Sequence, residues 1–77
     1  MEPLDYKFEI EREEFPDKIV IEISWGIFSN DGQELESHSE GAVFPDDEGR
    51  EEAISIFEDR LALEFLDAYD ECVGILL

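Results

Sequence analysis

The chain has 77 residues, with 23 Asp and Glu against 5 Lys and Arg, for a formal net charge of −18. Its 12% aromatic content argues against a disordered acidic chain, and its single cysteine excludes an internal disulfide and a cysteine-based zinc site. The charge argues against nucleic acid or an anionic membrane as a direct partner. We expect one domain over residues 1–77, located in the cytoplasm because it shows no leader pattern and no long apolar run.

Residues 3–12 alternate apolar and polar side chains, which predicts a first strand with one buried face. The apolar positions are Leu4, Tyr6, Phe8 and Ile10, and the other face is mostly acidic. Residues 13–17 contain a Phe-Pro pair that breaks the strand and favours a turn.

Residues 18–28 form the only strongly β-branched run and predict a half-buried central strand. Its apolar face consists of Ile19, Ile21, Ile23, Trp25 and Ile27. We expect Trp25 to be buried between this strand and a helix.

An Asn-Asp-Gly sequence at 30–32 predicts a hairpin to a third strand over residues 33–44. A three-residue loop with Gly32 in the left-handed conformation would pair Trp25 with Ser37, whereas a two-residue loop would pair Trp25 with His38. We expect the first register because it turns small residues toward the helix and acidic residues toward solvent. The residues then expected on the solvent face are Glu34, Glu36, His38 and Glu40.

Pro45 ends the third strand, and Asp46 or Asp47 can cap a helix that runs to about Cys72. Gly74 is the expected residue after the helix, with residues 75–77 folding back. The sequence therefore predicts an α+β fold, a three-stranded antiparallel meander with one long C-terminal helix packed on one face.

Helical periodicity gives this helix an apolar stripe for the core and an acidic opposite face. The opposite face also carries Ile56 and Leu63, one heptad apart, which are either covered by another element or exposed among acids. We expect them to be exposed and to contact a second copy of the chain or a target protein. The acidic residues around them are Glu52, Asp59, Asp67 and Asp70.

No arrangement for catalysis or metal binding is found in the sequence. Strand alternation turns Ser37 and Ser39 away from His38, the only histidine, so no Ser-His pair forms locally. Cys72 falls on the apolar stripe, and the acidic stretch at 46–49 lacks calcium ligands at the required spacing. We expect a protein without enzymatic activity, cofactor or metal.

The length, the charge and the acidic residues on exposed faces resemble those of small anti-defence proteins of phages and mobile elements, namely anti-CRISPR proteins and anti-restriction DNA mimics. This resemblance implies inhibition by occupation, in which carboxylates replace DNA phosphates in the basic groove of a CRISPR effector or restriction enzyme. Same-face residues of a strand lie about 6.7 Å apart, on the scale of successive phosphates. The residues expected to contact such a partner are Glu9, Glu11, Glu22, Glu34, Glu36, Glu40, Glu52, Ile56, Asp59, Leu63 and Asp67.

The alternative is an immunity protein or antitoxin that neutralises a basic nuclease or toxin by binding beside its active site. A DNA mimic competes directly with DNA, whereas an immunity protein need not. An acidic interaction module of a cellular complex is a third hypothesis, and it would depend on Ile56 and Leu63 more than on the acids.

Overall fold

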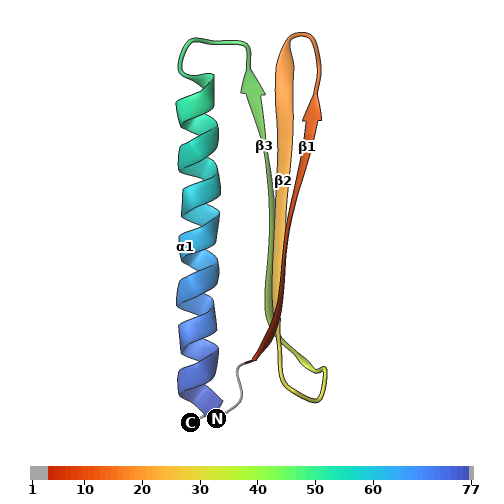
Figure 1. Cartoon of the computed structure of the whole chain (residues 1–77), viewed down its shortest axis with the longest axis vertical. Coiled ribbons are helices and arrows are strands. Elements are labelled where there is room, and N and C mark those ends of the chain that lie inside the picture. Colours follow the sequence, from red (N-terminus) through yellow and green to blue (C-terminus); the bar gives the residue numbers. More distant parts are fainter. Residues whose placement is uncertain (1–3, 77) are drawn as a thin grey trace.

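The computed structural model describes residues 4–76, which form a three-stranded antiparallel sheet followed by one helix (Figure 1). The strands run in the order β1-β2-β3, and the helix lies on one face of the sheet. The predicted α+β fold, a three-stranded meander followed by a helix, is confirmed. Pro3, the expected first residue of the first strand, lies outside the described residues. The elements are β1 (Asp5–Glu14), β2 (Lys18–Phe28), β3 (Glu34–Pro45) and α1 (Arg50–Leu76).

The helix begins and ends later than predicted. Its first backbone hydrogen bond runs from the Ala53 N–H to the Gly49 carbonyl, and the helix continues through Gly74 to Leu76. The predicted end near Cys72 is wrong because Gly74 does not take the left-handed conformation; Gly32 alone has a positive φ (89°) among the described residues. One glycine costs a helix only about 1 kcal/mol, and no proline follows it. Leu77 lies outside the described residues.

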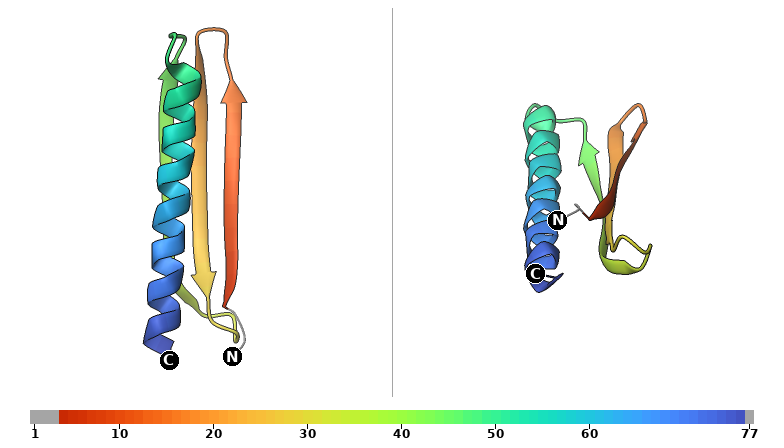
Figure 2. Two further views of the ribbon diagram at one scale, coloured as in Figure 1. Left: turned by 60° about the vertical axis from the view of Figure 1, so that its left-hand side comes forward. Right: turned by 60° about the horizontal axis from the view of Figure 1, so that its bottom comes forward.

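The core lies between α1 and the helix-facing side of β2. The backbone of α1 lies over β2 and β3 (Figure 2). Side chains of β1 reach it, such as the rings of Tyr6 and Phe8, which contact Phe65. Trp25 is buried on this side, as predicted. The other buried apolar side chains are Leu4, Ile19, Ile21, Ile23 and Ile27 from the sheet side, and Ile54, Phe57, Leu61, Ala68 and Cys72 from α1.

The register between β2 and β3 is the one that the sequence analysis rejected. Trp25 lies opposite His38, not Ser37, and Ile23 lies opposite Glu40. An irregularity beside Ile27 then pairs Phe28 with Glu34. Side chains alternate along a strand, so Glu36, His38 and Glu40 lie on the helix side. Because of the irregularity, Glu34 keeps its predicted place on the other side, next to Phe28.

Phe44 explains why this register is preferred. It faces α1 and contacts the ring of Phe57 at a centroid distance of 5.7 Å, whereas Val43 on the other side is 59% exposed. The register that the sequence analysis expected would bury Val43 and expose the larger apolar ring, which costs more. Glutamate side chains at a sheet edge can reach solvent from either side, so their charge constrains the register weakly.

Candidate acidic interface

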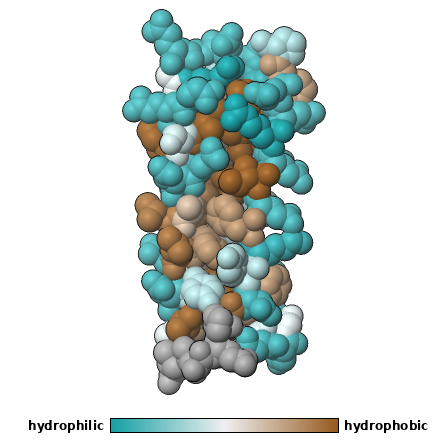
Figure 3. All heavy atoms as spheres, viewed as in Figure 1, coloured by the Kyte–Doolittle hydropathy of each residue, from teal (hydrophilic) through white to brown (hydrophobic). Residues whose placement is uncertain are grey.

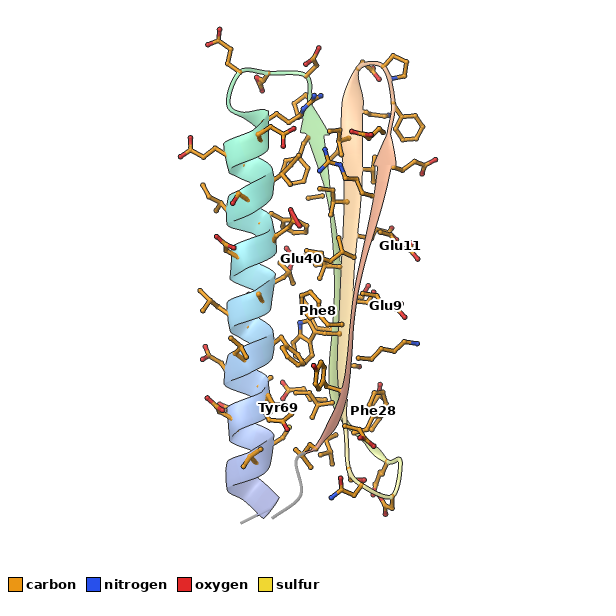
Figure 4. All side chains as sticks on the ribbon, in the orientation of Figure 1. Phe8, Glu9, Glu11, Phe28, Glu40 and Tyr69 are labelled. Carbon is orange, nitrogen blue, oxygen red and sulfur yellow. The ribbon has the colours of Figure 1, made fainter. Side chains whose placement is uncertain are left out.

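The face of the sheet that points away from α1, here called the outer face, carries exposed acids and is covered by no other element of residues 4–76. Figure 4 shows Glu9 and Glu11 pointing away from the helix. Pairing of the strands puts Glu22 and Glu34 on the same side. Four of the predicted contact residues therefore share one uncovered surface.

The acids of the outer face are poorly neutralised. Glu11 lies directly opposite Glu22 in the β1–β2 pairing, and neither carboxylate has an ion-pair partner within residues 4–76. Lys7 contacts Glu9 at 3.2 Å. Like charges directly opposite on a sheet are destabilising, so this surface lowers the stability of the fold that carries it.

Between the acids, the outer face is flat because its central residues are small. Ser24, Gly26 and Ser37 line a shallow hollow of about 220 Å³ that Glu9 and Glu34 also border. The ring of Phe28 lies beside Gly26, where an added Cβ would come within 3.1 Å of it. The small residues of the third strand were expected to face the helix. They lie instead on the outer face, where the neighbouring carboxylates project beyond them.

Glu36 and Glu40 do not belong to this surface, which corrects the sequence prediction. Glu40 points toward the helix side (Figure 4) and accepts a hydrogen bond from Arg60. This bond, followed by the contact with His38 at 3.2 Å, lowers the pKa of Glu40. Glu36 lies 3.9 Å from the Sγ of Cys72. The pKa of that thiol is raised, first by burial and then by the charge of Glu36.

Three potential metal ligands meet beside Arg60. Atoms of His38, Glu40 and Glu64 lie within 4.8 Å of one another. Arg60 hydrogen-bonds Glu40 and also Glu64, the latter at 3.2 Å. Because the guanidinium already pairs with both carboxylates and would repel a cation, this group is an ion-pair cluster that holds α1 against β3.

Of the acids predicted on the helix, Asp67 borders a hollow beside Ser37 and His38 of β3, whereas Glu52 and Asp59 lie on the outward side of α1, away from the sheet. Ile56 and Leu63 are each 61% exposed there, as expected. The acidic residues Glu52, Asp59 and Asp67 are exposed as well. The structure therefore divides the predicted contact residues between two opposite surfaces of the molecule, except for Glu36 and Glu40, which lie between α1 and β3.

Sequence reasoning missed an exposed apolar strip beside β1. The first strand was expected to bury one face, yet Tyr6 is 63% and Ile10 is 48% exposed. The reason is the position of α1, which leaves β1 without a cover. The sequence did contain a signal for this exposure, because it predicts three strands with apolar faces but only one helix to cover them. Figure 3 shows apolar surface between α1 and the sheet.

No protein-family model, curated protein or solved structure matches this chain. Within the described residues, α1 is too polar to serve as a membrane-spanning helix.

Proposed function

We propose that this protein is a non-enzymatic inhibitor that occupies the DNA-binding groove of a basic nucleic-acid-binding protein, such as a CRISPR effector or a restriction enzyme. The observation that carries this proposal is the density of charge along the molecule. The long axis spans 47 Å, and the chain has a net charge of −18, roughly one net negative charge per 2.6 Å, against one negative charge per about 1.7 Å of duplex DNA.

The shape of the molecule supports the same proposed function. The other two axes span 18 and 14 Å, so the molecule is a narrow rod with acids on its sheet and helix surfaces. A groove lined with Lys and Arg for a duplex would meet carboxylates on both sides of such a rod. Attraction between the opposite charges would also accelerate association.

The unneutralised pair of Glu11 and Glu22 supports a role for the acids in binding. Two like charges directly opposite each other on a sheet destabilise the folded state by about 0.2 to 1 kcal/mol. A basic groove would supply the missing cations and remove that cost on binding. The outer face of the sheet is therefore the principal contact in this proposal.

Competition with DNA is the primary test. Binding partners are captured from the source cell with and without added duplex DNA, and each captured protein is then assayed for DNA binding at increasing concentrations of this chain. We expect direct displacement of DNA and an affinity that falls steeply as salt rises. Simultaneous binding of DNA and this chain would contradict the mimic and favour an immunity protein that binds beside the active site.

Charge reversal locates the contact. Glu9, Glu11 and Glu22, all replaced by Lys, should abolish displacement of DNA. A matched control changes the net charge equally at one end of the rod, with Lys at the exposed residues Asp17, Asp47 and Glu48. The control should retain most of the activity, since its acids lie in turns outside the outer face. Equal losses in both variants would mean that net charge, and not this surface, governs binding.

A further inference from the structure

The apolar strip beside β1 consists of Tyr6, Phe8 and Ile10 from β1 and of Phe65, Leu66 and Tyr69 from α1. The rings of Tyr6 and Phe65 lie 5.3 Å apart, and those of Phe8 and Phe65 lie 5.5 Å apart. The Tyr69 hydroxyl accepts a hydrogen bond of 3.0 Å from the Leu4 N–H, which ties the end of α1 to the chain entering β1. The strip is thus a fixed surface.

The strip is exposed well beyond what scattered surface residues require. Tyr6, Ile10 and Leu66 are 63%, 48% and 54% exposed. The accessible surface of the whole chain is 5465 Å², whereas size scaling gives about 4,800 Å² for a compact protein of this mass. The excess of roughly 650 Å² is spread over the whole elongated molecule, and the exposed side chains of the strip contribute part of it.

The space above the strip has the width of a helix. The backbone of α1 lies over β2 and β3, and Figure 2 shows β1 uncovered beside it. Packed helices lie 8–10 Å apart, about two strand spacings of ~4.8 Å. A second helix alongside α1 would therefore lie over β1, touching the sheet with one side and the flank of α1 with another. A strand added to the edge of β1 would miss the flank of α1.

Both borders of the strip are acidic. On α1, the exposed residues Asp59 and Asp70 lie beyond Leu66 on the side turned away from the sheet. On β1, the exposed residues Glu9 and Glu11 project from the other face of the same strand. A second copy of this chain is disfavoured as the occupant because each copy has a net charge of −18. The borders favour a helix with cationic flanks.

We propose that the strip is the docking site for an amphipathic helix of the partner protein, apolar on one side with Lys and Arg along its flanks. This proposal rests on the proposed function only in taking the partner to be basic. The contact adjoins the outer face of the sheet at β1, so one partner could hold the carboxylates in its groove and seat a neighbouring helix on the strip.

A synthetic peptide tests the site without the partner. The probe is a peptide of about 15 Leu and Lys residues with Leu at i, i+3, i+4 and i+7, the spacing of one helix face. It is compared with a scrambled peptide of the same composition and with one that alternates Leu and Lys as a strand would. We expect tight binding of the helical pattern alone, with NMR shift changes at Tyr6, Ile10 and Leu66.

Two matched double variants locate the binding. Ile10→Ser with Leu66→Ser should weaken binding of the helical peptide by about tenfold or more. Phe15→Ser with Leu35→Ser removes exposed apolar side chains outside the strip, from the connection between β1 and β2 and from β3, and should leave the affinity unchanged. If the first variant proves unfolded by circular dichroism, Leu66→Lys replaces it, because it adds a repelling charge at an exposed position.

Three results would overturn the proposal. One is equal binding of the scrambled or alternating peptide. Another is an equal loss of affinity in the Phe15 and Leu35 control. The third is a wild-type dimer that dissociates when Ile10 and Leu66 are replaced, because a second copy would then occupy the strip. The peptide assay involves no DNA-binding protein, so its failure leaves the DNA competition result standing, and the reverse holds as well.

Discussion

Glu11 and Glu22 lie directly opposite each other on the uncovered face of the sheet, on neighbouring antiparallel strands. Each is exposed, and neither has an ion-pair partner within residues 4–76. A cross-strand pair of opposite charge at this position would stabilise the sheet. The pair therefore lowers the stability of the sheet, a cost that binding of a cationic partner would remove under the proposed function.

Glu11→Lys should raise the melting temperature, because it converts the repulsive pair with Glu22 into an attractive one and lowers the net charge. The expected gain is about 0.5 to 1 kcal/mol in the free energy of unfolding, measured by thermal or urea denaturation at low salt. The same variant should bind the basic partner more weakly.

Glu13→Lys is the control for this prediction. Glu13 is also exposed on β1, but it lies directly opposite Val20 and not opposite an acid, so the change alters the net charge equally while Glu11 and Glu22 still face each other. An equal gain in stability from Glu13→Lys would assign the effect to overall repulsion and not to the contact between Glu11 and Glu22.

The sequence predicted the elements and the core of β2 because their signals are local. Alternation of isoleucines with polar residues identifies the buried face of β2, and Trp25 is buried as expected. The hairpin register depends instead on a competition between faces of β3. Counting exposed acids favoured the wrong register, whereas the burial of Phe44 against Phe57 favours the observed one.

The acidic surface was predictable only in part for the same reason. Glu9, Glu11 and Glu22 follow from alternation within their strands, whereas Glu36 and Glu40 depended on the register and lie on the other side. The ion pair of Glu40 with Arg60 joins positions far apart in sequence, and no local pattern indicates it. The uncovered β1 depends on where α1 lies across the sheet, which periodicity does not specify.

Thermal stability should rise with salt concentration. At a net charge of −18, repulsion among carboxylates opposes the compact state, and added ions screen it, with a Debye length of about 10 Å at 0.1 M and ~3 Å at 1 M. Melting temperatures measured across this range test the expectation. A melting temperature that stays constant would show that the local ion pairs already balance the repulsion.

Glu40→Gln should destabilise the protein at neutral pH and have no effect in strong acid. Hydrogen bonds from Arg60 and His38 lower the pKa of Glu40 in the folded state. A depressed carboxyl pKa contributes stability above the unfolded value, and that contribution disappears as pH falls through the folded value. The measurement is the difference in melting temperature between the parent and Glu40→Gln as a function of pH. A difference that persists below the carboxylate range would contradict the role of the charge.

Trp25→Ala should leave little folded protein. Trp25 is 6% exposed, and its ring contacts Phe65 at 5.8 Å. Truncation of a buried aromatic costs about 3 to 5 kcal/mol, a large share of the stability of so small a domain. Circular dichroism and urea denaturation measure the loss, and Ile56→Ala at an exposed position is the control. A variant that melts like the parent would show that Trp25 contributes little to the core.

Replacement of both Ile56 and Leu63 by Ser should leave the fold intact and weaken association with the partner. Both side chains are 61% exposed on the outward side of α1, and surface substitutions of this kind usually change stability by less than about 0.5 kcal/mol. Among the acids Glu52, Asp59 and Asp67 they form an apolar centre with a charged rim, the arrangement that concentrates binding energy in protein interfaces.

Thermal melts and partner affinity are measured together for this variant, with Phe15→Ser as the control. Phe15 is 40% exposed between β1 and β2, so the control removes an exposed apolar side chain that lies outside both acidic surfaces. If the partner surrounds the molecule as it would surround a DNA duplex, it contacts α1 as well as the sheet. The double variant then binds the partner more weakly, even though the principal acids lie on the sheet. Unchanged affinity would restrict the contact to the sheet and to the strip beside β1, and a loss of folding would place Ile56 and Leu63 in the core.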